Sequence, residues 1–453
     1  MRRVVKVSRI RIIITIIVVV LTTLLTGCTG KEPNEIAYVV ALGIDSTDDD
    51  NYKITIQYAN TTQISGGASE SGGKAGSEIV DNVTIEAPNI YAGVGLANNI
   101  VSKSFSMSHA KLIVFSKEIA EKGVKDMIET LVRSEEIRPD VFIAVANTTA
   151  NDYLTSVNPE MEVNPAQYYQ LIYQKNQLVG ISDGQLREFF TGLYTDNYDS
   201  ILPVAGVIEG AGGNSQNDDK GQSKDSQNEG SEGSSESLDS FESKNSDENE
   251  KEKDAEKNTS KYEYDIKNYV GGETAIEKKN KAEAIGAAVF EKDKMVGELG
   301  EVETEICKML KGDYTYSYLT YYNNDTPDIP ITVKTTQQKK PKYKIDTDKK
   351  TVDIELYIES DLYSLPADYN VENKIEDFER DVANYTSSAC TEFINNFTKK
   401  YNSDILKLNE KVKYKFLTNN QYNWFKKNVG WSEYKFSVCT NFKVRRTGLI
   451  VRE

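Results

Sequence analysis

A polar, acidic segment at residues 211–260 is the feature that most limits how this chain can fold. The segment contains 14 Asp or Glu and 6 Lys residues, a net charge of −8, and Phe241 is its only aromatic residue. Such a composition cannot bury enough apolar surface to offset the conformational entropy that ordering would cost. We therefore expect residues 210–262 to form a disordered acidic linker or insertion between two folded blocks. A role as an acidic binding tail is the alternative.

The rest of the composition indicates folded domains and excludes several functions. The 453 residues are 38% hydrophobic and 27% charged, and the formal net charge is −16. This length suffices for two or three domains. An acidic chain is a poor candidate for a nucleic-acid-binding protein, because phosphate recognition needs clustered Lys and Arg. His109 is the only histidine, which excludes most histidine-based metal sites and catalytic triads.

The N-terminus has the pattern of a secretory signal peptide. Residues 1–11 carry five Arg or Lys residues and no acidic residue, and residues 12–25 are almost wholly apolar. An apolar run of this length is short for a helix that crosses a bilayer, which needs about 20 residues. We therefore expect residues 1–27 to be a signal peptide that is cleaved off. An uncleaved transmembrane anchor is the alternative.

The signal ends in Leu25-Thr26-Gly27-Cys28, which resembles a bacterial lipobox. In a lipobox, small residues let a signal peptidase reach the bond before a cysteine that carries a diacylglycerol. Two acyl chains give stable anchoring where one gives marginal binding. Because basic residues precede the apolar run, the chain after Cys28 should lie outside the cytoplasm. We therefore predict that Cys28 is a lipid anchor and that this covalent lipid is the only bound group, with no metal and no cofactor.

Residues 28–209 alternate between strand and helix patterns. β-branched apolar runs, with a period of two in the second, predict an antiparallel hairpin over 36–45 and 52–60. Further strands alternate with helical patterns downstream, an order typical of an α+β or α/β layer domain. The expected strands are 109–116, 138–147 and 201–209, and the expected helices are 88–103 beginning at Pro88, 117–134, 165–177 and 182–194.

Residues 263–453 form the second predicted block. Two strands flank a turn at 291–294, and a helix is expected at 301–312. Alternating Tyr, Thr and Val then indicate an antiparallel sheet with one solvated face. Apolar residues at spacings of three and four predict a long helix over 371–402, which we interpret as core packing. The sheet strands are expected at 314–322, 328–336, 341–346 and 351–360, with a closing strand around 436–444.

The sequence contains no strong catalytic motif. HExxH, GxSxG and GxxxxGK[ST] do not occur, and Gly-Val-Gly at 93–95 lies inside a predicted helix instead of following a strand. A carboxylate pair for glycoside hydrolysis stays open, because acidic residues are plentiful and none stands out. We therefore predict that the protein is not an enzyme and that its catalytic and cofactor-binding residues are none.

The histidine and the remaining cysteines receive structural interpretations. Ser108 and His109 are adjacent in a predicted strand, where neighbouring side chains point to opposite faces. We therefore predict that they do not form a nucleophile–base pair and that His109 makes a structural hydrogen bond. Apart from Cys28, the cysteines are odd in number and form no CxxC pair, so we interpret them as buried free thiols. They are Cys307, Cys390 and Cys439.

Three stretches of sequence together carry a family resemblance. The first, NEIAYVVALGIDSTDDDNYKITIQ, follows the lipobox closely; the second is FSMSHAKLIVFSKEIAEKGVKDMIETLVRSEEIRPDVFIAVA. The third joins GAAVFEKDKMVGELGEVETEICKMLKG to a closing KVRRTGLI. They resemble the Ger(x)C family, the lipoprotein C subunits of nutrient germinant receptors in bacterial spores. The matching positions are Glu35, Gly43, Ile44, Asp45, His109, Lys111, Ala120, Gly123, Arg133, Arg138, Arg445, Arg446, Thr447 and Gly448.

The resemblance covers nearly all of the chain after Cys28 except 211–260. It implies a multi-domain α+β fold of about three subdomains, with mixed or antiparallel sheets and packed helices. It implies an N-terminal C-subunit domain at 28–209 and a C-terminal one at 263–453. One departure is local: the stretch before the last strand keeps Trp424 and Trp431 but lacks the family's prolines.

The resemblance also implies partners and a location. The expected partners are an A subunit and a polytopic, transporter-like B subunit, with the lipid holding the chain on the outer face of the inner spore membrane. We expect a non-enzymatic receptor subunit that is required for germination in response to nutrients. The alternatives are a solute-binding lipoprotein of a transporter, which should have two similar lobes around a cleft, and a cell-wall hydrolase.

Overall fold

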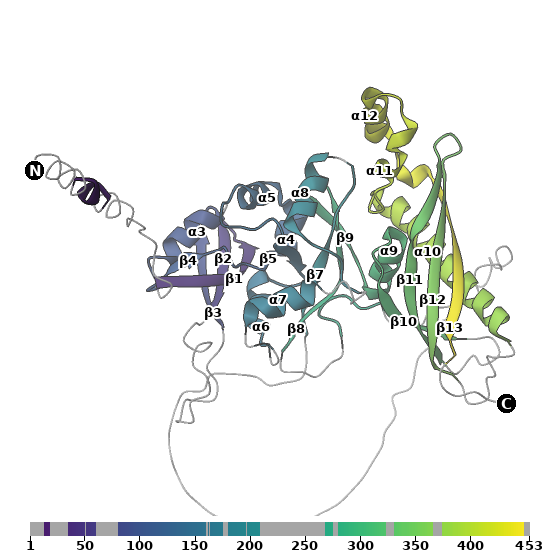
Figure 1. Ribbon diagram of the computed structural model, residues 1–453, viewed down its shortest axis with the longest axis horizontal. Coiled ribbons are helices and arrows are strands. Elements are labelled where there is room, and N and C mark those ends of the chain that lie inside the picture. Colours follow the sequence, from purple (N-terminus) through teal and green to yellow (C-terminus); the bar gives the residue numbers. More distant parts are fainter. Residues whose placement is uncertain are drawn as a thin grey trace, which may run out of the picture. The chain divides into compact units, whose positions relative to one another are not determined.

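The structure is a computed structural model in which the described residues form two β-sheets, each with its own helices (Figure 1). Cys28 and the acidic segment lie outside the described residues, so the predictions for 1–27, Cys28 and 210–262 stay predictions. Among the described residues, no helix is long and apolar enough to cross a membrane. The described residues are 13–18, 35–49, 51–59, 80–159, 162, 164–174, 180–195, 197–208, 268–274, 280–322, 330–365 and 374–447.

The first sheet has nine strands of mixed direction. β1 pairs antiparallel with β2 and parallel with β5, so the predicted hairpin is confirmed. The strand order is β3-β2-β1-β5-β6-β7-β8-β9, and β4 pairs with β1 outside this path. The strands are β1 (Ile36–Ser46), β2 (Tyr52–Ala59), β3 (Val80–Ala87), β4 (Ser104–Ser106), β5 (Leu112–Ser116), β6 (Phe142–Ala146), β7 (Ile201–Val207), β8 (Ala282–Glu291) and β9 (Lys294–Leu299).

Helices cover both faces of the first sheet. In β5, Ile113 and Phe115 pack into one core while Leu112 and Val114 pack into another, because successive side chains point to opposite faces. A strand buried on both sides reads as a continuous apolar run, which explains the sequence of β5 and β6. One face carries α3 (Ile90–Ala97), α4 (Lys117–Lys122), α5 (Lys125–Val132) and α8 (Leu186–Thr195), and the other carries α6 (Ala150–Ser156) and α7 (Pro165–Gln174).

Two helix predictions in this region were wrong in detail. The predicted helix 117–134 is divided into α4 and α5 at Gly123, whose φ of +124° is open to glycine but costly for other residues. The helix predicted to begin at Pro88 is α3, which begins at Ile90. The reason is Asn89, whose side chain accepts a backbone N–H of the first turn at 2.9 Å and so caps the helix.

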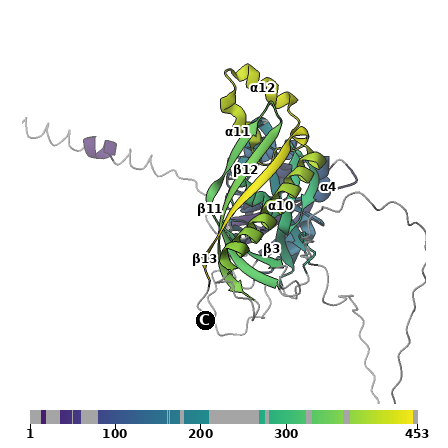
Figure 2. The same ribbon diagram turned by 90° about the vertical axis from the view of Figure 1, so that its right-hand side faces the viewer.

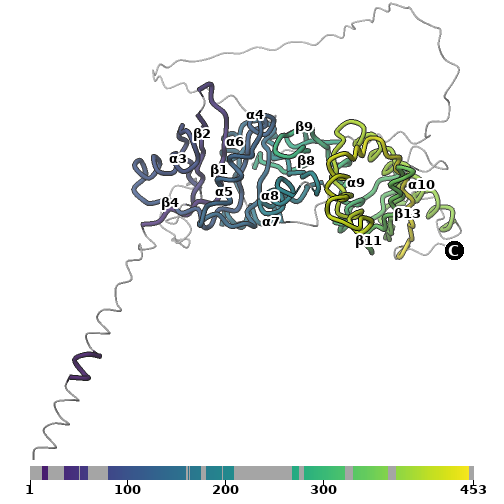
Figure 3. Tube along the Cα trace, turned by 90° about the horizontal axis from the view of Figure 1, so that it is seen from above, coloured from purple at the N-terminus to yellow at the C-terminus, as the bar shows by residue number. Residues whose placement is uncertain are grey.

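The strands on either side of the acidic segment are neighbours in the first sheet. β7 pairs antiparallel with β8, and the N–H of Ile208 donates to the carbonyl of Lys281 at 3.0 Å. β8 then pairs with β9 across the predicted turn at 291–294. The first sheet therefore draws on both predicted blocks. The tube in Figure 3 follows the chain from β8 and β9 into α9 (Glu301–Lys311).

Residues 268–274 pack directly on β7. A Cβ at Gly206 would lie 2.1 Å from backbone atoms of Gly271 and Gly272, so only glycine allows this approach. The side-chain amide of Asn147 donates to the carbonyl of Gly271 at 2.6 Å. The chain is thus fixed to the sheet again shortly after the acidic segment.

The second sheet has the strand order β10-β11-β12-β13. In β12, Val352, Ile354 and Leu356 are buried while the residues between them are not, which confirms the predicted alternation. The two short strands predicted at 328–336 and 341–346 are one strand, and Pro341 lies where the β11–β12 register shifts. The strands are β10 (Tyr316–Tyr322), β11 (Pro330–Asp346), β12 (Thr351–Ser364) and β13 (Lys435–Arg446).

The strands expected to be antiparallel are so, and the closing strand makes the sheet mixed. β10, β11 and β12 pair antiparallel, but β13 pairs parallel with β12. Parallel neighbours need a long crossover connection, which contains α10 (Ile375–Tyr401), α11 (Leu408–Val412) and α12 (Asn419–Asn428). Most of the predicted core stripe of α10 is confirmed. Its buried members are Phe378, Val382, Tyr385, Ile394 and Phe397, whereas Ile375, Ala389 and Tyr401 are half-buried.

Helix α10 closes the free edge of β13 with polar side chains. Figure 2 shows α10 along this strand, and its side-chain oxygens accept alternate backbone N–H groups. Four helical residues rise about 6.0 Å and two strand residues about 6.6 Å. Acceptors four residues apart on α10 therefore face N–H groups two residues apart on β13. Protecting an edge in this way prevents pairing with another chain. The bonds run from Phe436, Val438, Thr440 and Val444 to Asn395 (3.1 Å), Thr391 (3.0 Å), Ser387 (2.9 Å) and Glu379 (2.8 Å) respectively.

Deletion of residues 211–260 should leave the fold intact. The deletion shortens the connection between Ile208 and Lys281 from 72 to 22 residues, which lowers the loop-closure cost by about 1 kcal/mol. We expect the free energy of unfolding, measured by urea titration, to stay equal or rise by about that amount. Deletion of 268–274 is the contrasting variant and should destabilise the protein. Loss of the cooperative transition on deleting 211–260 would contradict the expectation.

Thr391→Val should destabilise the second sheet. The substitution keeps the shape of the side chain but leaves the N–H of Val438 without its acceptor, at a cost of about 1–3 kcal/mol. The matched control is Thr386→Val on the same helix, because the buried Thr386 hydroxyl has no hydrogen-bond partner in the described part of the chain. Both tryptophans lie near this sheet, so fluorescence during urea unfolding measures the difference. Equal stability of the two variants would refute the edge-capping role.

A candidate ligand-binding cleft

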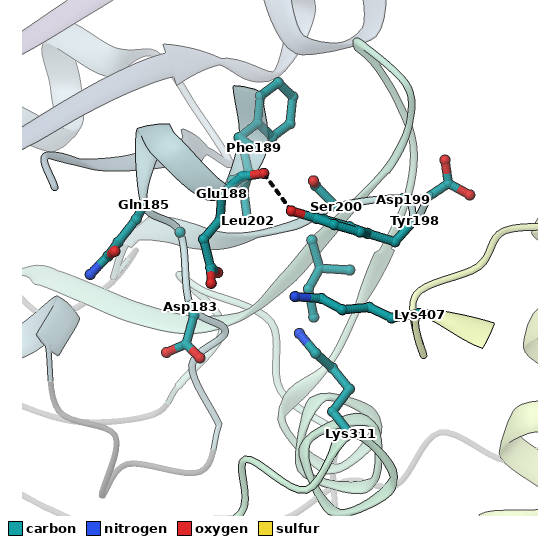
Figure 4. Close-up of a pocket in the computed structure, with 12 residues that line it drawn as sticks. Asp183, Gln185, Glu188, Phe189, Tyr198, Asp199, Ser200, Leu202, Lys311 and Lys407 are labelled. Carbon is teal, nitrogen blue, oxygen red and sulfur yellow. Dashed lines mark hydrogen bonds between the residues drawn. The ribbon is translucent and has the colours of Figure 1, made fainter. Parts of the chain in front are cut away.

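A small polar cleft lies where α8 and the start of β7 meet the end of α9 and the residue before α11. Its space is about 330 Å³ when the part open to solvent is included, and the enclosed part holds only water-sized molecules. In Figure 4, the side chains of Lys311 and Lys407 point toward the wall of the cleft that carries Glu188 and Asp183. The cleft is lined by Asp183, Gly184, Gln185, Glu188, Phe189, Tyr198, Asp199, Ser200, Ile201, Leu202, Lys311 and Lys407.

Close backbone packing at Gly184 fixes one wall of the cleft. A Cβ at this position would lie 2.4 Å from Cδ of Pro203 and 2.6 Å from the carbonyl oxygen of Ile143. The N–H of Ile143 donates to the Gly184 carbonyl at 2.6 Å. Glycine therefore lets the loop before α8 lie directly on β6 and β7, and this contact places Asp183 and Gln185 at the cleft.

Tyr198 contacts both a lysine and a helix carbonyl in the cleft. The Nζ of Lys407 lies 4.4 Å from the centroid of the Tyr198 ring, within cation–π range. The Tyr198 hydroxyl donates to the Glu188 carbonyl at 3.0 Å. Burial, with the nearby charges of Glu188 and Glu410, raises the pKa of Tyr198 to about 12. The phenol therefore stays protonated at neutral pH and keeps this hydrogen bond.

Asp199 and Asp404 join the first sheet to the region before α11. The N–H of Asp404 donates to Oδ2 of Asp199 at 2.8 Å, and the N–H of Asp199 donates to the Asp404 carbonyl at 3.2 Å. The Asp404 carboxyl group also accepts the N–H groups of Leu408 at 2.6 Å and Asn409 at 2.8 Å, as a cap of α11. Burial outweighs these two hydrogen bonds and raises the pKa of Asp404 to about 7.

Two lysines hold the neighbourhood of the cleft at other points. Lys308 of α9 donates to the carbonyl of Ile181 at 3.0 Å, and burial lowers its pKa. Lys426 of α12 donates to the carbonyl of Thr195 and to Oδ1 of Asn197, both at 3.0 Å. These three bonds reach carbonyl or amide oxygens of residues before and after α8, so the neighbourhood of the cleft is fixed from two sides.

The structure corrects the prediction for Ser108 and His109. Both lie in a turn before β5, so the argument from opposite strand faces does not apply. The Ser108 hydroxyl contacts Nδ1 of His109 at 3.0 Å. His109 is exposed, and its ring packs edge-on against Tyr38 with the centroids 4.8 Å apart. The predicted structural hydrogen bond thus exists, but its partner is the neighbouring serine.

Part of the family resemblance in the sequence has a structural explanation at β1. Asp45 accepts the N–H groups of Ala150 at 2.6 Å and Asn151 at 3.0 Å, so it caps α6. A Cβ at Gly43 would lie 3.0 Å from Leu154 and 3.1 Å from Ala150. Gly43-Ile44-Asp45 therefore seats α6 on the sheet, and burial raises the pKa of Asp45.

The other residues named from the sequence do not gather at the cleft. Cys307 and Cys390 are buried free thiols as predicted, and burial raises their pKa values to about 11 and 12. Cys439 is free but exposed, because it lies on the outward face of β13. Arg445, at the end of β13, lies 3.7 Å from Glu359. No group of three or more His, Cys, Asp or Glu suited to a metal ion occurs among the described residues.

The cleft residues were not predicted from the sequence. They come from 183–202, from Lys311 and from Lys407, and none of these positions belongs to a motif. The local signal is a glycine after Asp183 at the start of a helix, which is too common to identify a site. Glu188 and Lys311 supply charges of both signs, and the enclosed part of the cleft has room only for water-sized molecules. The two sheets around it differ in strand number and order, unlike the two similar lobes expected of a solute-binding lipoprotein.

Two sequence families match most of the chain. The Spore germination protein N-terminal domain matches residues 30–207, and the Spore germination B3/GerAC like, C-terminal family matches residues 285–448. A solved structure, the crystal structure of the GerBC protein, aligns with 89% of this chain and 96% of its own. The TM-score of this alignment is 0.48 and the sequence identity is 15%.

Three curated proteins of Bacillus subtilis (strain 168) are similar to part of the chain. Spore germination protein KC is 27% identical over 156 residues, which is 34% of this chain and 38% of KC. Putative spore germination protein YfkR is 28% identical over 145 residues, 32% of this chain and 37% of YfkR. Spore germination protein B3 is 26% identical over 148 residues, 30% and 36% respectively. The chain thus spans less than two fifths of the length of these relatives.

Stability should fall as the pH rises from about 4 to about 7. Folding raises the pKa of Asp404 from 3.8 to about 7, so the folded state binds more protons than the unfolded state between these values. Stability therefore falls with rising pH by up to about 1.4 kcal/mol per unit, and this contribution is constant above pH 7. Asp404→Asn should reduce the slope, measured as the free energy of unfolding in urea between pH 4.5 and pH 7.5.

The slope should be reduced but not abolished. Burial raises the pKa of Glu305 to about 7 as well. Titration of this carboxyl group therefore also lowers the free energy of unfolding as the pH rises. Glu410→Gln, at an exposed carboxylate of α11, is the control and should keep the full slope. An Asp404→Asn variant with the parent's slope would show that Asp404 is not the titrating group.

Proposed function

Since the chain belongs to the Ger(x)C family of spore germination proteins, we propose that it is a lipid-anchored, non-enzymatic subunit of a nutrient germinant receptor. The observation that carries the proposal is the order of features on one chain: a lipobox, then the two family matches at 30–207 and 285–448. These matches confirm the family resemblance of the sequence. The role that we propose is to make germination respond to nutrients.

The proposed anchor is a covalent lipid on Cys28, and it acts by confinement. Residues 29–35 can span at most about 25 Å, so the lipid would hold the start of β1 at Ile36 close to the membrane surface. Confinement to a surface raises the effective concentration toward integral membrane partners. The partners that we propose are the A subunit and the polytopic B subunit, on the outer face of the inner spore membrane.

We propose that the subunit acts without catalysing a reaction. The Ser108–His109 contact is the arrangement closest to a catalytic pair that we find among the described residues. A nucleophile–base pair works when a third group orients the base, but here the exposed His109 ring packs on Tyr38. This environment supports a structural role for the pair.

A solute-binding lipoprotein of a transporter is the second candidate. The cleft with Glu188 and Lys311 favours it, because paired charges can bind a small polar solute. The dissimilar sheets weigh against it. Purified protein that binds a small solute, with loss of binding in Lys311→Gln, would favour this candidate or a germinant contact at the same place. If the purified protein bound no nutrient that triggers germination, the cleft would not be a ligand site of the proposed receptor.

Cys28→Ala should release the protein from the membrane and slow germination. Without the thiol no lipid can be attached, and a single weak contact does not hold a protein on a bilayer. Membrane fractionation of spores and the optical-density loss on adding nutrients measure the two effects. Cys439→Ala, at an exposed thiol, is the matched control and should behave as the parent. Normal membrane retention and normal germination of the Cys28→Ala variant would refute the anchor.

A further inference from the structure

The region from α11 to α12 carries an exposed surface of unusual composition. Figure 1 shows the two helices at the end of the second sheet where β11 turns into β12. The surface, which we call the α12 patch, combines large apolar side chains with lysines. The patch consists of Lys413, Tyr414, Leu417, Trp424 and Lys427, all exposed.

The apolar members of the patch are exposed far more than is usual for their type. Leu417 is 95% exposed, Tyr414 is 80% exposed and Trp424 is 69% exposed. Single exposed apolar residues are normal on protein surfaces, but clustered ones mark interaction sites. Three such residues lie within eleven positions of sequence, from the turn after α11 to the middle of α12.

The exposure of the patch does not come from poor packing of the region. Phe425 of α12 packs against Phe416 at 4.9 Å and against Trp431 at 6.1 Å between ring centroids. Tyr422 is buried on the same side of the helix. A capping box at Thr418 fixes the start of α12. With one side of the helix seated in this way, Trp424 is presented outward from a rigid support.

The charge of the region is opposite to that of the chain. Residues 407–427 contain six Lys and one Glu, in a chain with a net charge of −16. Lys411, Lys415 and Lys426 are used inside the protein, where they donate to backbone carbonyls, Lys415 to that of Ile345. Lys413 and Lys427 are exposed in the same stretch of sequence as the apolar side chains. The patch therefore offers local positive charge to a negative surface.

We propose that the α12 patch binds the headgroup region of an anionic lipid bilayer. Trp and Tyr are enriched at membrane interfaces, because their rings are apolar while one polar group stays hydrated. Lys side chains reach toward phosphate with their charged ends while their stems cover apolar surface. Leu417 and Trp424 would enter the interface, and the lysines would contact the lipid phosphates. This proposal does not depend on the receptor role, since it needs only lipid.

A protein partner is the competing occupant, and the charges favour lipid. A typical protein interface is depleted of Lys, with aromatic residues at its centre. In the patch, the exposed Lys413 and Lys427 lie in the same stretch of sequence as the apolar residues. An anionic bilayer attracts each lysine without needing a fixed geometry. The contact would be a second attachment to the membrane, in addition to the proposed lipid on Cys28.

The two tryptophans allow a direct test. Trp424 is exposed and Trp431 is 2% exposed, so collisional quenching by acrylamide reports mainly on Trp424. The probe is vesicles of phosphatidylglycerol and phosphatidylethanolamine, mixed with residues 28–453 carrying Cys28→Ser so that no lipid is attached. We expect a blue shift and protection from acrylamide, both lost in Trp424→Phe, which retains only the buried tryptophan. Pure phosphatidylcholine vesicles should produce neither effect.

Variants separate the two parts of the contact. Lys413→Gln with Lys427→Gln should weaken vesicle binding by about fivefold per lysine. Leu417→Ser with Trp424→Ser should weaken it by roughly tenfold or more. The matched controls are Lys122→Gln with Lys125→Gln, and Tyr363→Ser, a 60% exposed aromatic residue on β12. Both controls should bind as the parent does, and all variants should unfold at the same urea concentration.

Several outcomes would overturn the proposal. Unchanged acrylamide quenching of Trp424 with anionic vesicles would show that lipid does not cover the patch. Equal weakening by the control substitutions would show non-specific charge attraction. Protection of Trp424 only in membranes that contain other proteins would assign the patch to a protein partner.

Discussion

The antiparallel pairing of β7 with β8 is the contact on which the arrangement of the described residues depends. It joins residues that lie on opposite sides of the acidic segment, and it continues through β9 into α9. A second core then contains Ile201 of β7, Val289 of β8, Leu310 of α9 and Phe436 of β13. A long segment between β7 and β8 is compatible with this pairing, because the entropic cost of closing a loop grows slowly with its length.

The free edge of the second sheet is closed by a helix instead of a strand. The crossover that makes β13 parallel to β12 also returns α10 along the outer edge of β13. Because four helical residues and two strand residues advance nearly equally, Asn395, Thr391 and Ser387 meet successive N–H groups. This arrangement leaves α11 and α12 beyond the end of the sheet, where the cleft and the α12 patch are formed.

Local patterns predicted most elements of the fold, and the errors have physical causes. Period-two alternation predicted the hairpin of β1 and β2 and the strands of the second sheet. Apolar spacings of three and four predicted α10, and α9 was also predicted. The break at Gly123 depends on one positive φ, and the direction of β13 depends on a distant connection, so neither can be read from a short window. The cleft was not predictable, because Glu188, Lys311 and Lys407 meet only in the folded chain. Cys28 remains a prediction from its motif.

The central claim is that this chain works as one subunit of a membrane receptor. The most direct measurement is affinity capture from detergent-solubilised inner membranes of spores, using a tag at the C-terminus and identification of the co-purifying proteins. The account predicts recovery of a polytopic membrane subunit together with a second large membrane subunit, in constant ratio to the tagged chain. Recovery of a solute permease, or of the tagged chain alone, would contradict it.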